Sequence, residues 1–259
     1  MSAPGALFVR PPLALEPLEA VEMTASQRAA VHMCASLLLD YPSEGELGRR
    51  LDAVEEALAG VPSPVRERLA GFVADARERG ERALAEHYVD VFDRRRRCCL
   101  YLTYYAVGDT RQRGAALVAF KQALAASGYE MAGDELPDYL PVVLEFSARS
   151  AERGDEIAGA LLASHREGIE VLRSALMDIG SPYAGLVEAV CMTLAPLDEP
   201  TAERIRRLVA AGPPTETVGV TEVLPFPSVP VSMPVSMPLA GPFQQFQSEA
   251  VLGVAPVQE

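Results

Sequence analysis

Residues Leu84–Gly114 read LAEHYVDVFDRRRRCCLYLTYYAVGDTRQRG, and the rest of the chain is organised around this stretch. Tyr88, Val91 and Phe92 recur at the i, i+3, i+4 spacing that places apolar side chains on one face of a helix. The arginine block Arg94–Arg97 follows, and after it comes a run rich in tyrosine. This order predicts a helix over Glu81–Asp93 that ends in positive charge and leads into an aromatic segment.

The arginine block admits three interpretations. Such a patch can bind nucleic acid or direct nuclear import, but the chain has a formal charge of -13, and nucleic acid requires a basic footprint. The arginines can instead be a solvated helix end, where positive charge complements the helix dipole. In the third interpretation they pair with carboxylates of the chain or of an acidic partner. Tyr101, Tyr104 and Tyr105 then form an apolar groove beside them, although ordinary helix packing also accounts for these side chains.

Composition places the chain among globular proteins. It has 259 residues, of which 49% are hydrophobic, and no run of 18 apolar residues that would predict a membrane span. The N-terminus lacks the charged and apolar regions of a signal peptide. The four cysteines have no CxxC spacing, which favours free thiols in a reducing compartment. We therefore expect a cytoplasmic protein with no direct membrane insertion and no nucleic-acid partner.

Helix start and stop signals predict three parts of the chain. Residues 1–23 contain prolines and predict a flexible N-terminal arm, and residues 24–211 predict a single all-α domain whose first helix is capped by Thr24 or Ser26. Residues 212–259 are rich in proline, which opposes helix and central strand, so we expect a disordered tail. This tail is either a docking segment or a tolerated extension.

Within the helical domain, proline and glycine mark most of the expected boundaries. We expect breaks at Pro42, Gly60, Gly80, Gly128 and Gly180–Pro182. Between them we expect one long helix from about Gly154 to Ile179, and then shorter helices over about Tyr183–Leu194 and Thr201–Ala211. No convincing period-2 alternation occurs up to Ala211, so we expect no strand in the domain.

The sequence lacks the motifs of the common catalytic sites. His32, His87 and His165 stand in no HExxH or ExxH pattern, which favours packed or surface histidines over metal ligands. Cys98 and Cys99 are neighbours, and neighbouring side chains on a helix point about 100° apart, so they favour buried thiols over a shared metal. We expect no enzyme activity, no metal and no cofactor.

Four segments carry a resemblance to a known family. The strings YVDVFDRRRRCCLYLTYYAVGDTRQRG, LPDYLPVVLEFSA, LLLDYPSE and GSPYAGLVEAVCMTL closely resemble the nitrate reductase molybdenum cofactor assembly chaperones, also called the nitrate reductase delta subunit. The resemblance covers about Ala25 to Leu208. It implies a helical bundle of the redox-enzyme maturation type and a cytoplasmic chaperone. Such a chaperone binds the apo catalytic (alpha) subunit through its N-terminal segment, assists cofactor insertion and delays membrane docking.

The same resemblance implies a binding site. The wider superfamily carries an Asp-His pair in a proline-containing connector, and here that pair falls on Asp138 and Tyr139. A hydrogen-bonding role suits the tyrosine, whereas a titrating imidazole is absent. We predict a client-peptide groove built from Phe92, Arg97, Tyr101, Tyr104, Arg111, Arg113, Asp138, Tyr139, Leu140, Leu144 and Glu145.

In that groove, Asp138 and Glu145 attract basic client residues, and the arginines orient the connector or hold client carboxylates. Proteins of molybdenum cofactor biosynthesis are further partners that the resemblance allows. The alternative, of a different class, is a helical adaptor or small-ligand regulator with no chaperone role.

Overall fold

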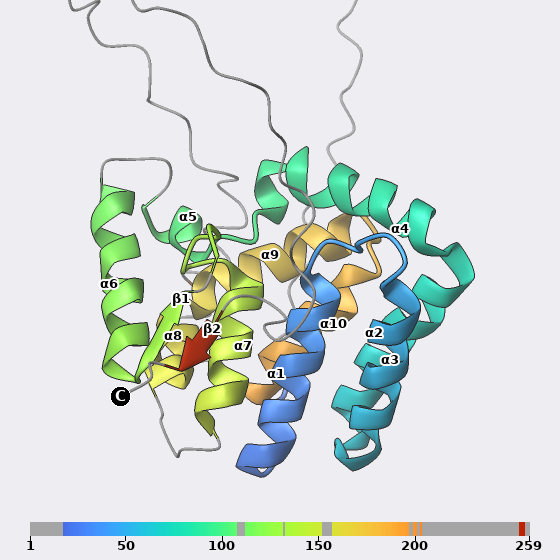
Figure 1. Ribbon diagram of the computed structural model, residues 1–259, viewed down its shortest axis with the longest axis horizontal. Helices are drawn as coiled ribbons and strands as arrows, with labels where there is room; N and C mark the ends of the chain where they lie inside the picture. The colour runs from blue at the N-terminus through green and yellow to red at the C-terminus, as the bar shows by residue number, and fades with distance from the viewer. Residues whose placement is uncertain are drawn as a thin grey trace, which may run out of the picture.

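The structure is a computed structural model, which describes residues 18–107, 112–131, 133–151, 157–196, 199–200, 203 and 254–256. Over these residues the chain is a helical bundle, as the sequence predicts (Figure 1). Its α-helices are α1 (Ala25–Leu39), α2 (Leu47–Ala57), α3 (Ser63–Arg79), α4 (Glu81–Tyr88), α5 (Leu102–Val107), α6 (Gln112–Ala126), α7 (Leu140–Ala151), α8 (Ile157–Ser164), α9 (Arg166–Asp178) and α10 (Tyr183–Thr193).

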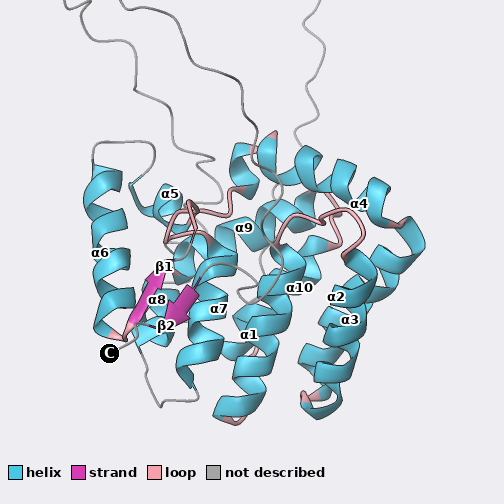
Figure 2. Ribbon diagram, viewed as in Figure 1, coloured by secondary structure: helices cyan, strands magenta, loops and turns pink. Residues whose placement is uncertain are grey.

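Shorter elements connect these helices. A 3-10 turn, η1 (Leu58–Gly60), follows α2; a π-helical turn, η2 (Val89–Asp93), extends α4; and η3 (Arg96–Cys98) is another 3-10 turn. The strands β1 (Tyr129–Met131) and β2 (Val254–Pro256) pair antiparallel, as the two arrows in Figure 2 show. The expectation of a strand-free domain is therefore wrong at Tyr129–Met131, a segment too short to show a periodic pattern.

The core is centred on α10 and on the pair α1 and α7, which lie side by side (Figure 1). Helix α10 also packs against α3 and α9, so most of its side chains are buried. The predicted apolar face of the first helix, with Val31, Cys34 and Leu38 among its members, is buried as expected. Apolar burial of this kind supplies the main stabilisation of the fold.

Local capping signals fix several boundaries where the sequence predicts them. Thr24 forms a capping box with Gln27: the Gln27 amide donates to the Thr24 hydroxyl (3.2 Å), and the Thr24 amide donates to the Gln27 side chain (2.9 Å). Further along the chain, Gly180 has φ of +63° and separates α9 from α10.

The single helix predicted from Gly154 to Ile179 is instead two helices that meet at His165. Ser164 Oγ donates to the Leu161 carbonyl (2.9 Å), and His165 Nδ1 lies 2.9 Å from the same oxygen. These side chains compete with the helical amide bond for one acceptor, which is a known cause of helix bending. The predicted helix over Thr201–Ala211 lies outside the described residues, apart from Glu203.

Of the predicted disordered tail, the structure describes only Val254–Pro256, and these residues form a strand. The remaining tail residues and the arm up to residue 17 lie outside the described part.

Candidate functional site

The aromatic segment and the proline-containing connector meet through their backbones. Tyr101 and Tyr139 form an antiparallel bridge. The Leu102 amide donates to the Asp138 carbonyl (2.9 Å), and the Leu140 amide donates to the Leu100 carbonyl (2.8 Å). Two segments that the sequence separates are therefore held together as one rigid unit, which joins the start of α5 to the start of α7.

Asp138 secures this junction from inside. Its side chain is fully buried, and its Oδ2 accepts hydrogen bonds from the Thr103 hydroxyl (2.5 Å) and the Thr103 amide (3.1 Å). Because Thr103 lies in the first turn of α5, the carboxylate satisfies an amide that the helix leaves free. The predicted role for Asp138, attraction of basic client residues, does not fit this position, since the carboxylate presents no surface.

Tyr139 does form a hydrogen bond through its hydroxyl. The Tyr139 and Tyr88 hydroxyl oxygens lie 2.8 Å apart, and both side chains are buried. The ring of Tyr139 lies 5.3 Å from that of Tyr101, and the ring of Tyr88 lies 5.4 Å from that of Tyr41. These four tyrosines form a continuous aromatic row that connects the surface around Tyr101 with the exposed Tyr41.

Tyr101 and its neighbours form the accessible part of the predicted site. Tyr101 is half-buried; its hydroxyl donates to Glu135 (3.1 Å), and the Arg113 guanidinium lies 5.5 Å above its ring. Burial, together with the Glu135 carboxylate, raises the pKa of Tyr101 to about 12, so the phenol stays protonated at neutral pH.

Beside Tyr101, the remaining accessible residues belong to the same segment. The half-buried Tyr104 has its ring 5.6 Å from that of Tyr105, whose hydroxyl donates to the Cys99 carbonyl (2.8 Å). Arg97 is exposed. Arg113 lies over the Tyr101 ring, and the Arg97 carbonyl accepts a hydrogen bond from the Tyr105 hydroxyl (3.1 Å). Arg97, Tyr101, Tyr104 and Arg113 are exposed or half-buried members of the predicted groove, and we refer to these four residues as the aromatic surface. Arg111 lies outside the described residues.

The other predicted groove residues belong to the core. Leu140, Leu144 and Glu145 are fully buried on α7, so they offer no groove surface. Glu145 accepts a hydrogen bond from Arg149 (2.7 Å), and burial raises the pKa of its carboxyl. Phe92 is half-buried with its ring 4.8 Å from that of Tyr183, which makes it part of an internal aromatic cluster.

The burial of these residues could not be predicted from the sequence, because their pattern fits an accessible groove and a buried core equally well. Apolar spacing shows which side chains share a helix face, but not whether that face meets another helix.

The arginine block is exposed from Arg94 to Arg97, as expected for a solvated helix end. Arg94 forms an ion pair with Asp90 one turn earlier (2.9 Å), which agrees with internal pairing at that position.

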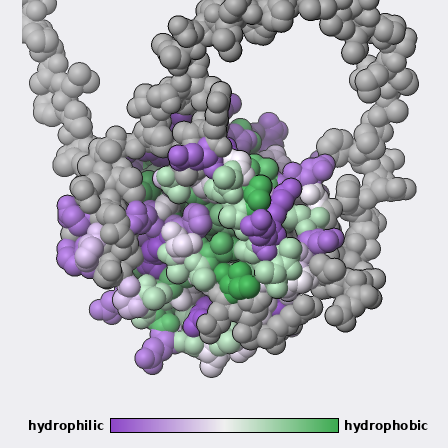
Figure 3. All heavy atoms as spheres, turned by 90° about the vertical axis from the view of Figure 1, so that its left-hand side faces the viewer, coloured by the Kyte–Doolittle hydropathy of each residue, from purple (hydrophilic) through white to green (hydrophobic). Residues whose placement is uncertain are grey.

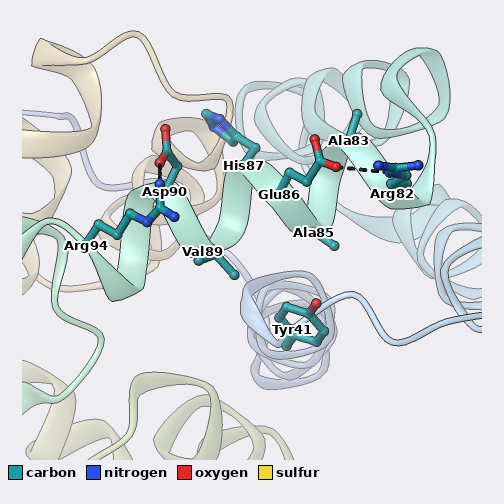
Figure 4. A pocket seen from close by; sticks show the side chains of 9 residues that line it. All are labelled: Tyr41, Arg82, Ala83, Ala85, Glu86, His87, Val89, Asp90 and Arg94. Atoms are coloured by element: carbon teal, nitrogen blue, oxygen red, sulfur yellow. Dashed lines mark hydrogen bonds and ion pairs between the residues drawn. The ribbon is translucent and has the colours of Figure 1, made fainter.

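A hollow along α4 and η2 was missed by the sequence reasoning (Figure 4). Its volume is about 740 Å³, and the exposed Tyr41 and two small apolar residues of α4, Ala83 and Ala85, are among the residues that line it. The ion pairs Arg82–Glu86 (3.0 Å) and Asp90–Arg94 border it. Tyr41 was the available signal: an aromatic residue beside a helix-ending proline, in LLLDYPSE.

The fold defines an all-helical class of protein, in which the half-buried Tyr101 and Tyr104 and the exposed Arg97 lie beside a backbone junction. Comparison with known proteins identifies the family. A family described as nitrate reductase delta subunit matches residues 58–188, which is half of the chain. The chain belongs to this family.

Individual relatives support the assignment. The chain is 32% identical over 173 residues to the probable nitrate reductase molybdenum cofactor assembly chaperone NarJ of Bacillus subtilis, covering 66% of this chain and 92% of that protein. It is 31% identical over 117 residues to the corresponding chaperone NarJ of Escherichia coli K12, covering 44% of this chain and 49% of the relative.

A third relative is considerably longer. The nitrate reductase-like protein NarX of Mycobacterium tuberculosis H37Rv is 41% identical over 163 residues, which is 63% of this chain but only 24% of that protein. This chain therefore spans about a quarter of the mycobacterial relative's length. Among the described residues, no helix is long and apolar enough to cross a membrane.

Proposed function

We propose that this protein is a non-catalytic cytoplasmic chaperone for a respiratory nitrate reductase. It binds the apo catalytic (alpha) subunit, assists insertion of the molybdenum cofactor, and delays docking onto the membrane anchor until assembly is complete. The observation that carries the proposal is family membership, together with a match along nearly the whole length of a relative named as such a chaperone.

The accessible surface around Tyr101 suits a peptide client. Tyr101 and Tyr104 offer large apolar faces with polar tips, and such side chains lose little conformational entropy on binding. Arg97 and Arg113 add positive charge that can hold client carboxylates or the peptide backbone. Because the junction through Asp138 fixes the backbone beneath them, the surface is ordered before the client arrives, which lowers the entropic cost of binding.

We further propose that the client segment is the N-terminus of the catalytic subunit, and that this surface receives part of it. The acidic chain as a whole can accelerate the encounter with a basic segment through long-range attraction. Proteins of molybdenum cofactor biosynthesis are the second class of partner in this proposal.

Calorimetric titration of the full-length protein with a synthetic peptide from the N-terminus of the nitrate reductase catalytic subunit tests the proposal. We expect saturable binding of roughly -8 kcal/mol or better, which corresponds to a micromolar dissociation constant. The variant Arg97→Ala/Tyr104→Ala should bind about tenfold more weakly, as expected when an aromatic anchor is removed.

The matched control is Arg49→Ala on α2, whose side chain is 80% exposed and which should bind like the wild type. Absence of binding by the wild-type protein would contradict the proposed client. Equal affinity of the wild type and the double variant would place the client site on another surface. In cells, nitrate reductase purified from a strain lacking this protein should contain less molybdenum.

A further inference from the structure

The strand β1 presents an edge that the chain covers with its own far C-terminal residues. Tyr129, Glu130 and Met131 pair antiparallel with Pro256, Ala255 and Val254. The paired strands lie between α6 and α7 in Figure 2, and β2 also lies against α7. Within the described residues these are the only two strands of the sheet, so each of them is an edge strand.

The β1 side of this pair is firmly anchored. The Tyr129 side chain is only 3% exposed, and its ring packs against that of Phe146 on α7 at 5.4 Å. Met131 is half-buried against the same core, whereas Glu130 points to solvent. The alternating pattern holds the backbone of β1 in an extended conformation, ready to pair with another strand.

The β2 side is held much more weakly. It contributes three residues, and one of them is Pro256, which has no amide hydrogen to donate. A two-stranded sheet this short is marginally stable in water, because its few hydrogen bonds barely offset the conformational entropy lost when the chain is ordered. β2 is therefore an occupant that another extended segment can displace at small cost.

We propose that the edge of β1 is a docking site for an extended segment of the client, which adds as a strand in place of Val254–Pro256. The inference rests on the proposed chaperone function and specifies how part of the client is held. The C-terminal strand then occupies the site in the free protein and competes with the client. Main-chain hydrogen bonds would supply the affinity, as in other cases of strand addition.

The surroundings define the chemistry of the segment that fits. A lysine or arginine placed in the register position of Ala255 would face Glu130 across the strands, and opposite charges in such cross-strand pairs are favourable. Helix α6 leads directly into β1 and exposes apolar side chains, with Val118 at 53% exposure. Figure 3, which views the side of the molecule that carries α6, shows apolar patches bordered by polar side chains.

The site thus fits an extended, mainly aliphatic segment with a basic residue at its centre. The connector that starts after β1 leads to Asp138 and Tyr139, and Tyr139 bridges to Tyr101. A short stretch of the chain therefore joins the edge of β1 to the aromatic surface.

A reversible cross-link tests this inference in the full-length protein. In the variant Glu130→Cys/Ala255→Cys the two thiols face each other across the strands, at a spacing that a disulfide can bridge. The oxidised form, with β2 locked onto β1, should bind the N-terminal client peptide at least about tenfold more weakly than the same protein after reduction. The single variants Glu130→Cys and Ala255→Cys are the controls and should bind equally well with and without oxidant.

A second variant acts in the opposite direction. Successive amides of a strand point to opposite sides, so Val254→Pro/Ala255→Pro removes the donor that faces β1, whichever residue carries it. This variant should bind the client peptide a few-fold more tightly than the wild type, because its own strand no longer competes.

The outcomes separate the two proposals. Equal affinity of the locked and reduced forms, with client binding intact, would overturn strand addition at β1 and leave the chaperone function standing. Absence of client binding by every form would overturn the proposed function and this inference together.

Discussion

Acidification should destabilise this protein through one buried histidine, His32 on α1. Its side chain is 1% exposed and joins three helices: Nδ1 lies 2.9 Å from Ser147 Oγ on α7, and Nε2 lies 2.7 Å from Thr193 Oγ1 on α10. Thr193 Oγ1 also donates to the Val190 carbonyl (2.7 Å). Because that hydroxyl proton is committed, Nε2 must donate to Thr193, and Nδ1 must accept from Ser147.

The neutral ring therefore satisfies every hydrogen bond, and protonation disturbs the arrangement. Burial, with a smaller contribution from Arg28, lowers the pKa of His32 from 6.5 to about 3. The unfolded chain binds a proton as the pH falls through its ordinary pKa, while the folded protein does not. The stabilisation that the neutral His32 ring contributes is therefore fully present above the pKa of His32 in the unfolded chain, and it decreases as the pH falls toward the pKa in the folded protein. At pH 5 the loss amounts to about 2 kcal/mol relative to pH 8.

Denaturant unfolding at pH 8 and pH 5 measures this loss. In His32→Gln, which cannot titrate, the decrease in unfolding free energy between the two pH values should be smaller than in the wild type by about 2 kcal/mol. Val31→Ala is the matched control: it weakens the same helix by about 1–3 kcal/mol but should keep the wild-type pH dependence. An identical decrease in His32→Gln and in the wild type would refute the reasoning, since the acid sensitivity would then come from other groups.

Two further predictions concern helix α9. In Gly168→Ala the added Cβ would lie 2.8 Å from Tyr105 Cβ, so we expect a loss of about 1–3 kcal/mol in unfolding free energy. In the control Gly71→Ala nothing lies within 4 Å of the added Cβ, so this variant should be neutral or slightly stabilising. Equal stability of both variants would contradict the close approach. In Glu170→Ala the buried Arg166 and Arg173 lose the carboxylate that they share, at 2.7 and 2.6 Å. We expect the free energy of unfolding, measured by thermal unfolding, to fall by about 3 kcal/mol or more. A decrease below about 1 kcal/mol would show that water or other groups replace the pairing.

Much of the helical architecture could be predicted from local signals. Thr24 caps α1 because its hydroxyl accepts from the Gln27 amide and the Gln27 side chain accepts from the Thr24 amide, within one turn. Gly180 ends α9 because only a residue without Cβ adopts its backbone conformation readily. Such signals act over a few residues, so a sequence displays them directly. The division at His165 carries no glycine or proline and was missed for that reason.

The candidate site was predicted only in part. Arg97, Tyr101 and Tyr104 were predicted within a segment that carries the family resemblance, and they are exposed or half-buried. Leu140 and Leu144 were selected by the same reasoning and lie in the core. A helix face lined with apolar residues looks the same in sequence whether it meets a client or the protein's own helices.

The sequence by itself determined the all-helical class and the positions of most helix ends, because helix propensity, capping and periodicity are local properties of the chain. Only the tertiary structure decided what each side chain meets. Asp138 caps α5 from a distant segment, His32 joins three helices, and Val254–Pro256 pair with β1. These contacts depend on how the helices pack, and packing brings together residues whose separation along the chain carries no signal of their proximity.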